Sequence, residues 1–176
     1  IIKSKGTIFN YTHSFKKCSA IRKIAYDKNI YEIAKGYLGC EPKFLGTQVF
    51  WSYPKEDASG NPINTPLYGF HYDIDDLKFL KLFFYLNDVD ENRGPHVIIE
   101  NTHLNKNLFE IKNRRISENQ AMSKYGSDRI KVITGKAGEG FFEDTFCYHK
   151  GTNPHKRRLM IQFQYAINDF NHQNDN

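Results

Sequence analysis

The stretch His71-Tyr72-Asp73 decides how the rest of this chain is interpreted. In a β-strand, residues two positions apart point to the same side, so His71 and Asp73 can hold one metal ion from a single strand or strand end. His149 follows much later in the chain, and Arg158 lies nine positions beyond it. If the strand that carries His149 folds back beside the first one, all three side chains face the same metal ion.

This combination of side chains is chemically specific. Two imidazoles and one carboxylate on one face of a metal are the ligand set of non-haem Fe(II) oxygenases, which leave the other coordination positions open. A 2-oxo acid that chelates such a metal needs a fixed cation for its far carboxylate, and the planar fork of an arginine suits it. Adjacent residues of a strand face opposite ways, so only one of Arg157 and Arg158 can point into the pocket. We expect Arg158, because Met160 and Gln162 would share its face.

Length and composition indicate one domain with a core rich in strands. A chain of 176 residues fits a single domain, here residues 1–176, and 15% of its residues are aromatic. The net charge is +5, and the densest basic cluster, Lys156-Arg157-Arg158, belongs to the candidate site itself. We therefore expect a small-molecule substrate, for which the basic charge permits an anionic group, and no nucleic-acid partner.

The cysteines and the hydropathy pattern bear on the compartment. Cys18, Cys40 and Cys147 are odd in number and lack the C-x-x-C spacing, which argues against a disulfide scaffold and against a zinc-thiolate site. No apolar run approaches the 18 residues or more of a membrane span, and no secretory signal is found at the N-terminus. These features favour a cytoplasmic protein that does not enter the membrane.

Short apolar runs separated by Gly, Pro, Asn and Asp predict a mainly β fold with a few flanking helices. Helical spacing of apolar residues over 19–38 predicts one or two helices that pack outside a sheet. Residues 54–66 read as a loop, 104–128 as a polar surface segment, and 167–176 as a tail, which leaves a core of about 45–166. The predicted strands are 46–53, 67–73, 78–86, 96–99, 129–134, 141–148 and 158–166.

Five motifs, in order, resemble the phytanoyl-CoA dioxygenase family of Fe(II)- and 2-oxoglutarate-dependent oxygenases. The resemblance covers roughly residues 45–166 and implies a double-stranded β-helix, the jelly roll also found in cupins. One departure is His96, which stands where the family usually has an aliphatic residue. The five motifs are His71-Tyr72-Asp73, the strand and turn Leu80–Val89, Glu91-Asn92-Arg93-Gly94-Pro95, Asn101-Thr102-His103, and His149-Lys150-Gly151 with Asn153-Pro154 and Arg158.

The resemblance also implies roles for individual residues. His71, Asp73 and His149 would bind Fe(II), and Arg158 would bind the distal carboxylate of 2-oxoglutarate, with O2 as the second co-substrate. The reaction would hydroxylate a small-molecule metabolite and release succinate and CO2. Four further residues are expected to line the pocket or contact the co-substrate: Phe83, Gln48, Lys81 and Tyr85.

Two other function classes stay open from the sequence. A cupin-like metal-dependent enzyme that is not an oxygenase would share the histidines but would not need Arg158. A non-catalytic binding domain of the same fold would need neither metal nor co-substrate. The identity of the substrate and the oligomeric state are not encoded in any motif of the chain.

Overall fold

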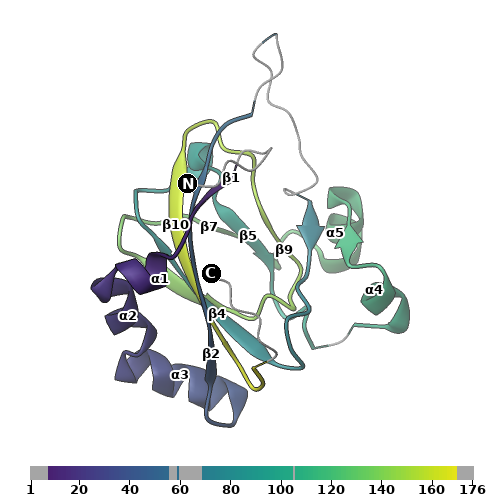
Figure 1. Ribbon diagram of the computed structural model, residues 1–176. Helices are drawn as coiled ribbons and strands as arrows, with labels where there is room; N and C mark the ends of the chain where they lie inside the picture. The colour runs from purple at the N-terminus through teal and green to yellow at the C-terminus, as the bar shows by residue number, and fades with distance from the viewer. Residues whose placement is uncertain (1–7, 56–58, 60–68, 105, 170–176) are drawn as a thin grey trace.

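Two five-stranded antiparallel sheets make up the frame of the protein in a computed structural model, which describes residues 8–55, 59, 69–104 and 106–169 (Figure 1). The first sheet has the strand order β1-β2-β10-β4-β8, and the second has the order β6-β3-β9-β5-β7. Strands distant in sequence are thus neighbours in both sheets. This is the double-stranded β-helix, or jelly roll, that the sequence predicts.

The strand bounds show which segments form each sheet. The first sheet contains β1 (Ile8–Tyr11), β2 (Lys43–Ser52), β10 (Arg158–Ala166), β4 (Phe79–Tyr85) and β8 (Gly140–Glu143). The second sheet contains β6 (Arg115–Ile116), β3 (Phe70–His71), β9 (His149–Gly151), β5 (His96–Ile99) and β7 (Ile130–Ile133).

Three helices near the N-terminus, α1 (Ser14–Lys17), α2 (Ser19–Ala25) and α3 (Lys28–Leu38), precede β2, and α2 and α3 cover the outer face of the first sheet (Figure 1). Asp27 begins α3 by accepting hydrogen bonds from the backbone of Asn29 and Ile30, and Gly39, with a φ of 78°, ends it. Apolar side chains of α2 and α3 pack on β2, β4 and β10 in one buried cluster. The helices predicted over 19–38 are therefore confirmed.

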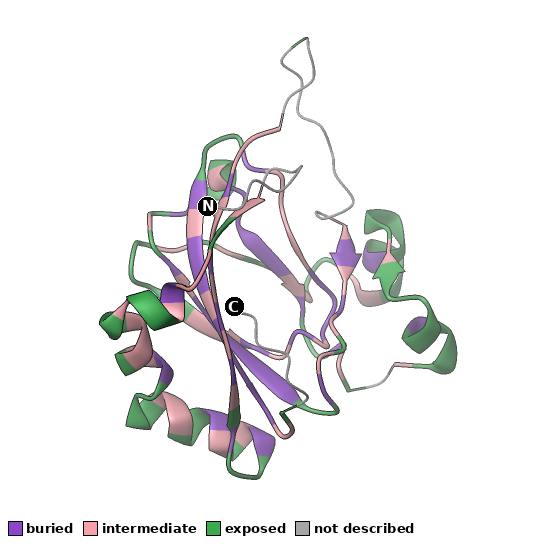
Figure 2. Ribbon diagram, in the orientation of Figure 1, coloured by how far each residue is buried: buried purple, intermediate pink, exposed green. Residues whose placement is uncertain are grey.

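The second sheet is covered by α4 (Leu108–Lys112) and α5 (Glu118–Tyr125) on the opposite side of the molecule (Figure 1). Ala121 of α5 is fully buried against an aromatic cluster that includes Phe70, Tyr72 and Tyr148. Figure 2 shows the consequence, since the buried residues concentrate on the strands and on the inward sides of the helices. The helices therefore pack on the outer faces of both sheets, and the candidate site lies between the inner faces.

Two predicted strands differ from the observed ones. The strand predicted over 141–148 is wrong, because β8 ends at Glu143 and residues 144–148 form a turn. Asp144 makes the turn by accepting hydrogen bonds from the backbone of Phe146 and Cys147, through its side chain and its carbonyl respectively. The chain thereby crosses from the first sheet to the second, and His149 begins β9 instead of ending an aromatic strand.

The other corrections are smaller. The strand predicted over 67–73 has only Phe70 and His71 in β3, while Leu67 and Tyr68 lie outside the described residues. Most of the loop predicted over 54–66 and the end of the tail, 170–176, also lie outside them. The three cysteines form no disulfide. Within the described ranges, no helix has the length and hydropathy needed to cross a lipid bilayer.

Candidate metal centre

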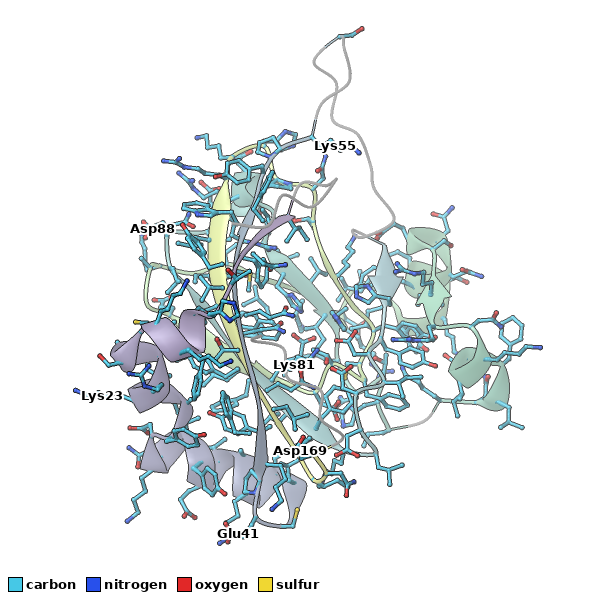
Figure 3. All side chains as sticks on the ribbon, viewed as in Figure 1. Lys23, Glu41, Lys55, Lys81, Asp88 and Asp169 are labelled. Atoms are coloured by element: carbon cyan, nitrogen blue, oxygen red, sulfur yellow. The ribbon has the colours of Figure 1, made fainter. Side chains whose placement is uncertain are left out.

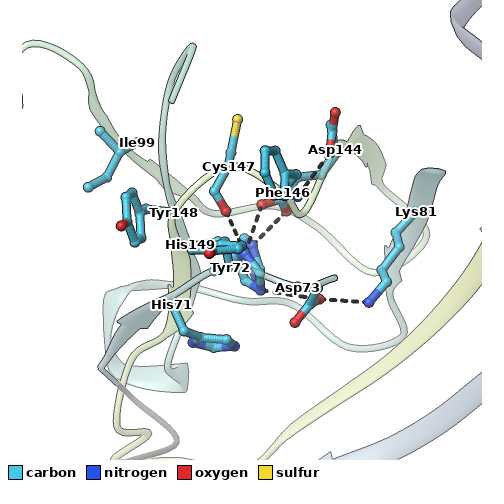
Figure 4. A network of polar contacts seen from close by, with 12 residues as sticks. His71, Tyr72, Asp73, Lys81, Ile99, Asp144, Phe146, Cys147, Tyr148 and His149 are labelled. Carbon is cyan, nitrogen blue, oxygen red and sulfur yellow. Dashed lines mark hydrogen bonds and ion pairs between the residues drawn. The ribbon is translucent and has the colours of Figure 1, made fainter. Parts of the chain in front are cut away.

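His71, Asp73 and His149 come together between the two sheets (Figure 4). His71 in β3 pairs directly with His149 in β9, and their ring centroids lie 4.5 Å apart. Asp73 follows β3 and is fixed by a backbone hydrogen bond of 2.8 Å from its N–H to the carbonyl of Thr145. The distance from His149 Nε2 to Asp73 Oδ2 is 3.7 Å, and one ligand atom from each residue lies within 4.8 Å of the other two.

Backbone carbonyls set the orientation of both imidazoles. His71 Nδ1 lies 2.9 Å from the carbonyl oxygen of Gly69, and His149 Nδ1 lies 3.0 Å from that of Cys147. A carbonyl only accepts hydrogen bonds, so each Nδ1 carries the proton and each Nε2 presents a lone pair. This second hydrogen bond is the usual support of a metal-binding histidine.

The protonation states also suit a metal. Burial lowers the pKa of His149 to about 4 and also lowers that of His71, so both rings are neutral at pH 7. Burial raises the pKa of Asp73, but Lys81 and His149 lower it by more, to about 2. Two neutral imidazoles and one carboxylate are therefore available, which is a donor set that fits a divalent transition metal such as Fe(II).

The three side chains open into a cavity of about 330 Å³ between the sheets, a volume suited to a small ligand. Both sheets contribute to its wall, and the first sheet supplies a row of inward side chains from β10. The cavity is lined by Ile8, Gln48, Phe50, His71, Asp73, Asp75, Lys81, Phe83, His96, His149, Gly151, Arg158, Met160, Gln162 and Gln164.

Arg158 is the arginine that faces this cavity. Only 4% of its surface is exposed, and its Nη2 donates to Ser52 Oγ at 3.3 Å while its Nη1 donates to the carbonyl of Gly94. Arg157 is exposed and lies over the ring of Trp51 at 5.2 Å. The choice between the two adjacent arginines therefore follows the alternation of β10, as the sequence predicts.

Of the four additional pocket residues expected, the structure places Phe83, Gln48 and Lys81 in the cavity wall. Gln162 Nε2 donates to Gln48 Oε1 at 3.1 Å. Tyr85 is the exception: it does not line the cavity, but packs behind Phe83 and Met160 in one apolar cluster and donates its hydroxyl to the carbonyl of Ile133. The alternation of β4 turns Tyr85 inward, but at a level where the barrel is filled with apolar side chains.

Sequence reasoning missed a buried pair beside the metal ligands. His96 Nε2 lies 2.6 Å from Glu143 Oε2, and the His96 ring stacks on that of His149 with centroids 5.4 Å apart. Only 6% of His96 is exposed, and it lines the cavity. The departure of His96 from the resembling family's pattern could have pointed to its place in the cavity. No feature of the sequence pointed to Glu143, because the strand predicted over 141–148 placed it within a strand and not at the end of one.

No known family model matches this chain, and no curated protein matches its sequence. Solved structures do share its fold. The epimerase SnoN in complex with Fe3+, alpha ketoglutarate and nogalamycin RO is 18% identical, with a TM-score of 0.65 over 91% of this chain and 63% of SnoN. At 18% identity, this structural similarity establishes that the two proteins share a fold.

Two further structures agree. HygX from Streptomyces hygroscopicus, with nickel, 2-oxoglutarate and hygromycin B bound, is 11% identical, with a TM-score of 0.59 over 91% of this chain and 70% of HygX. EctD from S. alaskensis, with 2-oxoglutarate and 5-hydroxyectoine, is 16% identical, with a TM-score of 0.61 over 91% of this chain and 56% of EctD. The chain thus spans less than two thirds of SnoN and of EctD.

Proposed function

We propose that this protein is an Fe(II)- and 2-oxoglutarate-dependent oxygenase that hydroxylates a small-molecule metabolite and releases succinate and CO2. The observation that carries the proposal is one cavity that contains His71, Asp73 and His149 together with the buried Arg158. The three ligands would hold the metal, and Arg158 would hold the far carboxylate of the co-substrate. Structures of the same fold contain 2-oxoglutarate with a metal, as in SnoN and HygX.

The chain's own residues would bind and orient the reactants. Arg158 is held at two of its nitrogens by Ser52 and Gly94, so its guanidinium is fixed before a carboxylate arrives. Phe83, Phe50 and Met160 form an apolar wall that would keep water from the co-substrate. When bound with 2-oxoglutarate and O2, iron supplies an oxidant able to break a C–H bond, and the protein positions that bond.

The substrate is proposed only as a class. SnoN, HygX and EctD are seen with nogalamycin RO, hygromycin B and 5-hydroxyectoine respectively, all small molecules. The cavity volume of about 330 Å³ suits a small molecule as well. The net charge of +5 would favour a substrate that carries an anionic group.

Anaerobic titration of 2-oxoglutarate into protein reconstituted with Fe(II) tests the proposal directly. The expected result is a weak visible charge-transfer band of the iron-bound 2-oxo acid. Arg158→Ala should raise the Kd for 2-oxoglutarate by at least about tenfold, since a hydrogen bond to a charged group contributes roughly 1.5–3 kcal/mol. Arg157→Ala is the matched control, because it removes the same charge from an exposed position.

Each outcome assigns the protein to one class. A band that weakens in Arg158→Ala and not in Arg157→Ala supports the oxygenase. Metal binding without any band would point instead to a cupin-like enzyme of other chemistry. Protein that binds no metal after reconstitution would be a non-catalytic member of the fold.

A further inference from the structure

Lys81 is a buried lysine beside the candidate metal centre. In Figure 3 it lies in the middle of the molecule, whereas Lys23, Glu41 and Asp88 lie at its edge. Its side chain is 8% exposed, and its Nζ lies 2.7 Å from Asp73 Oδ2 and 2.9 Å from Asp75 Oδ2. A lysine in this environment contacts one of the three metal ligands directly.

The rest of the barrel interior fixes this lysine in place. Lys81 belongs to β4, which lies between β10 and β8, so its strand is hydrogen-bonded on both sides. Gln164 Nε2 donates to Asp75 Oδ2 at 2.9 Å, which ties the second carboxylate to β10. The result is a continuous chain of contacts from Gln164 through Asp75 and Lys81 to Asp73. Such a chain restricts how the carboxylate of Asp73 can rotate.

We propose that Lys81 is a positioning residue that keeps one carboxylate oxygen of Asp73 away from the metal, so that Asp73 coordinates through the other oxygen alone. This inference rests on the proposed function. Figure 4 shows the carboxylate of Asp73 between the imidazole of His71 and the ammonium of Lys81. The ammonium binds Oδ2 of Asp73, the oxygen that also lies 3.7 Å from His149 Nε2, so the proposal assigns metal binding to the other oxygen, Oδ1.

The number of coordination positions on the metal explains why a monodentate Asp73 would matter. Two histidines and a monodentate carboxylate occupy one face of an octahedral metal and leave the opposite face open. A chelating 2-oxo acid would need two of the open positions, and O2 would need the third. A bidentate Asp73 would occupy one of them, so Lys81 preserves the position that O2 or the chelate requires.

Asp75 has a separate, electrostatic part. A lone ammonium next to a metal site would repel the cation, but the Lys81–Asp75 pair carries no net charge. Lys81 can therefore position Asp73 without weakening metal binding. Two variants differ for this reason. Lys81→Met removes the support of Asp73 and also changes the net charge beside the site. Lys81→Met/Asp75→Asn removes the ammonium and one carboxylate together, so the net charge beside the site stays the same.

The test compares Fe(II) and 2-oxoglutarate binding in the wild type, in the double variant and in Lys81→Arg, all under anaerobic conditions. Losing an outer partner of a ligand usually costs about 10- to 100-fold in metal affinity or activity. We expect the Fe(II)-loaded double variant to bind 2-oxoglutarate more weakly than Fe(II)-loaded wild type, because a bidentate Asp73 would occupy a position that the chelate needs. Its charge-transfer band should be weaker and shifted. Lys81→Arg should restore most of the band, because it keeps a cationic donor.

The outcomes separate this inference from the proposed function. A wild-type protein that shows no band defeats the proposed function, and this inference with it. A normal band in wild type together with an unchanged 2-oxoglutarate Kd in the double variant overturns only the role of Lys81. A crystal structure of the Fe(II)-loaded wild type provides a check that needs no variant, since a bidentate Asp73, or Lys81 turned away from it, contradicts the inference.

Discussion

The two faces of β4 and β10 differ in chemistry although they belong to the same strands, since the buried charged residues lie on one face alone. Outward side chains, among them Leu82, Ile161 and Phe163, are buried under α2 and α3 in an apolar cluster. Inward side chains, among them Lys81 and Arg158, line the cavity and carry charge. Alternation with a period of two residues thus lets one strand pair stabilise the fold on one face and hold reactive groups on the other.

Because of this difference, we expect that mutations along one strand can change the free energy of unfolding and the ligand affinity independently. The outer face contributes through burial of apolar area, which does not depend on any ligand. The inner face would contribute to ligand affinity, and the ammonium of Lys81 on it is paired with Asp73 and Asp75. Variants of the inner face should therefore change binding in a protein that stays folded, and variants of the outer face should do the reverse.

The largest effect is expected from Asp73→Ala, which removes a proposed metal ligand from the cavity. Metal affinity should fall by at least about 1000-fold, more than the roughly 10- to 100-fold that loss of an outer partner costs. The fold should survive, because Asp75 still pairs with Lys81. Fe(II) competition titration with circular dichroism checks both expectations. Asp88→Ala, at an exposed loop carboxylate, is the control, and unchanged metal affinity in Asp73→Ala would remove Asp73 from the site.

Phe163→Ala is expected to have the next largest effect, on the opposite face. Phe163 is fully buried in the cluster under the N-terminal helices and makes an edge contact with Phe84 at 6.2 Å. Its truncation should lower the free energy of unfolding by about 3–5 kcal/mol, measured by urea titration. Fe(II) affinity of the remaining folded protein should match wild type. A parallel loss of metal affinity would show that the two faces are coupled.

The sequence predicts the secondary-structure elements that depend on residues close together in the chain. β5 and β10 begin and end as the alternation and the flanking Gly and Pro residues indicate, and the apolar run of β4 is buried on both faces. The pairing of His71 with Asp73 follows from their spacing alone. Their meeting with His149 follows from the order of the motifs, which is specific to the resembling family.

The remaining features depend on contacts between distant segments. Asp144 ends β8 early by a side-chain turn, and nothing in the apolar pattern around it marks that end. The partners of Lys81 and His96 come from other strands or loops, so their roles need the sheet order. Tyr85 has the right alternation but packs in an apolar cluster and does not line the cavity. Alternation gives the direction of a side chain, whereas the depth along the barrel requires the three-dimensional structure.

A smaller effect, on pH dependence, sharpens the comparison between two carboxylates, the buried Glu110 and the partly exposed Asp73. Glu110 lies outside the second sheet, where Lys124 Nζ is 2.7 Å from its Oε1 and the backbone of Asn107 donates to its Oε2. Burial raises the pKa of Glu110, but Lys124, Tyr125 and Asn107 lower it by more, to about 2, the same value as for Asp73. Both carboxylate oxygens of Glu110 thus have hydrogen-bond or ion-pair partners within the protein, whereas Asp73 lines the cavity.

Because the pKa of Glu110 is lower in the folded than in the unfolded state, its stabilisation is present above about pH 5 and is lost as the pH falls toward about 2. We expect a contribution of about 2 kcal/mol, reduced from the full shift because Lys124 is half-exposed. The difference in unfolding free energy between wild type and Glu110→Gln, from urea titrations, should therefore shrink from about pH 6 to about pH 2.5. Added Fe(II) at neutral pH should stabilise both proteins equally, since Glu110 has no part in the cavity. A difference that stays constant with pH would mean that Glu110 titrates alike in both states.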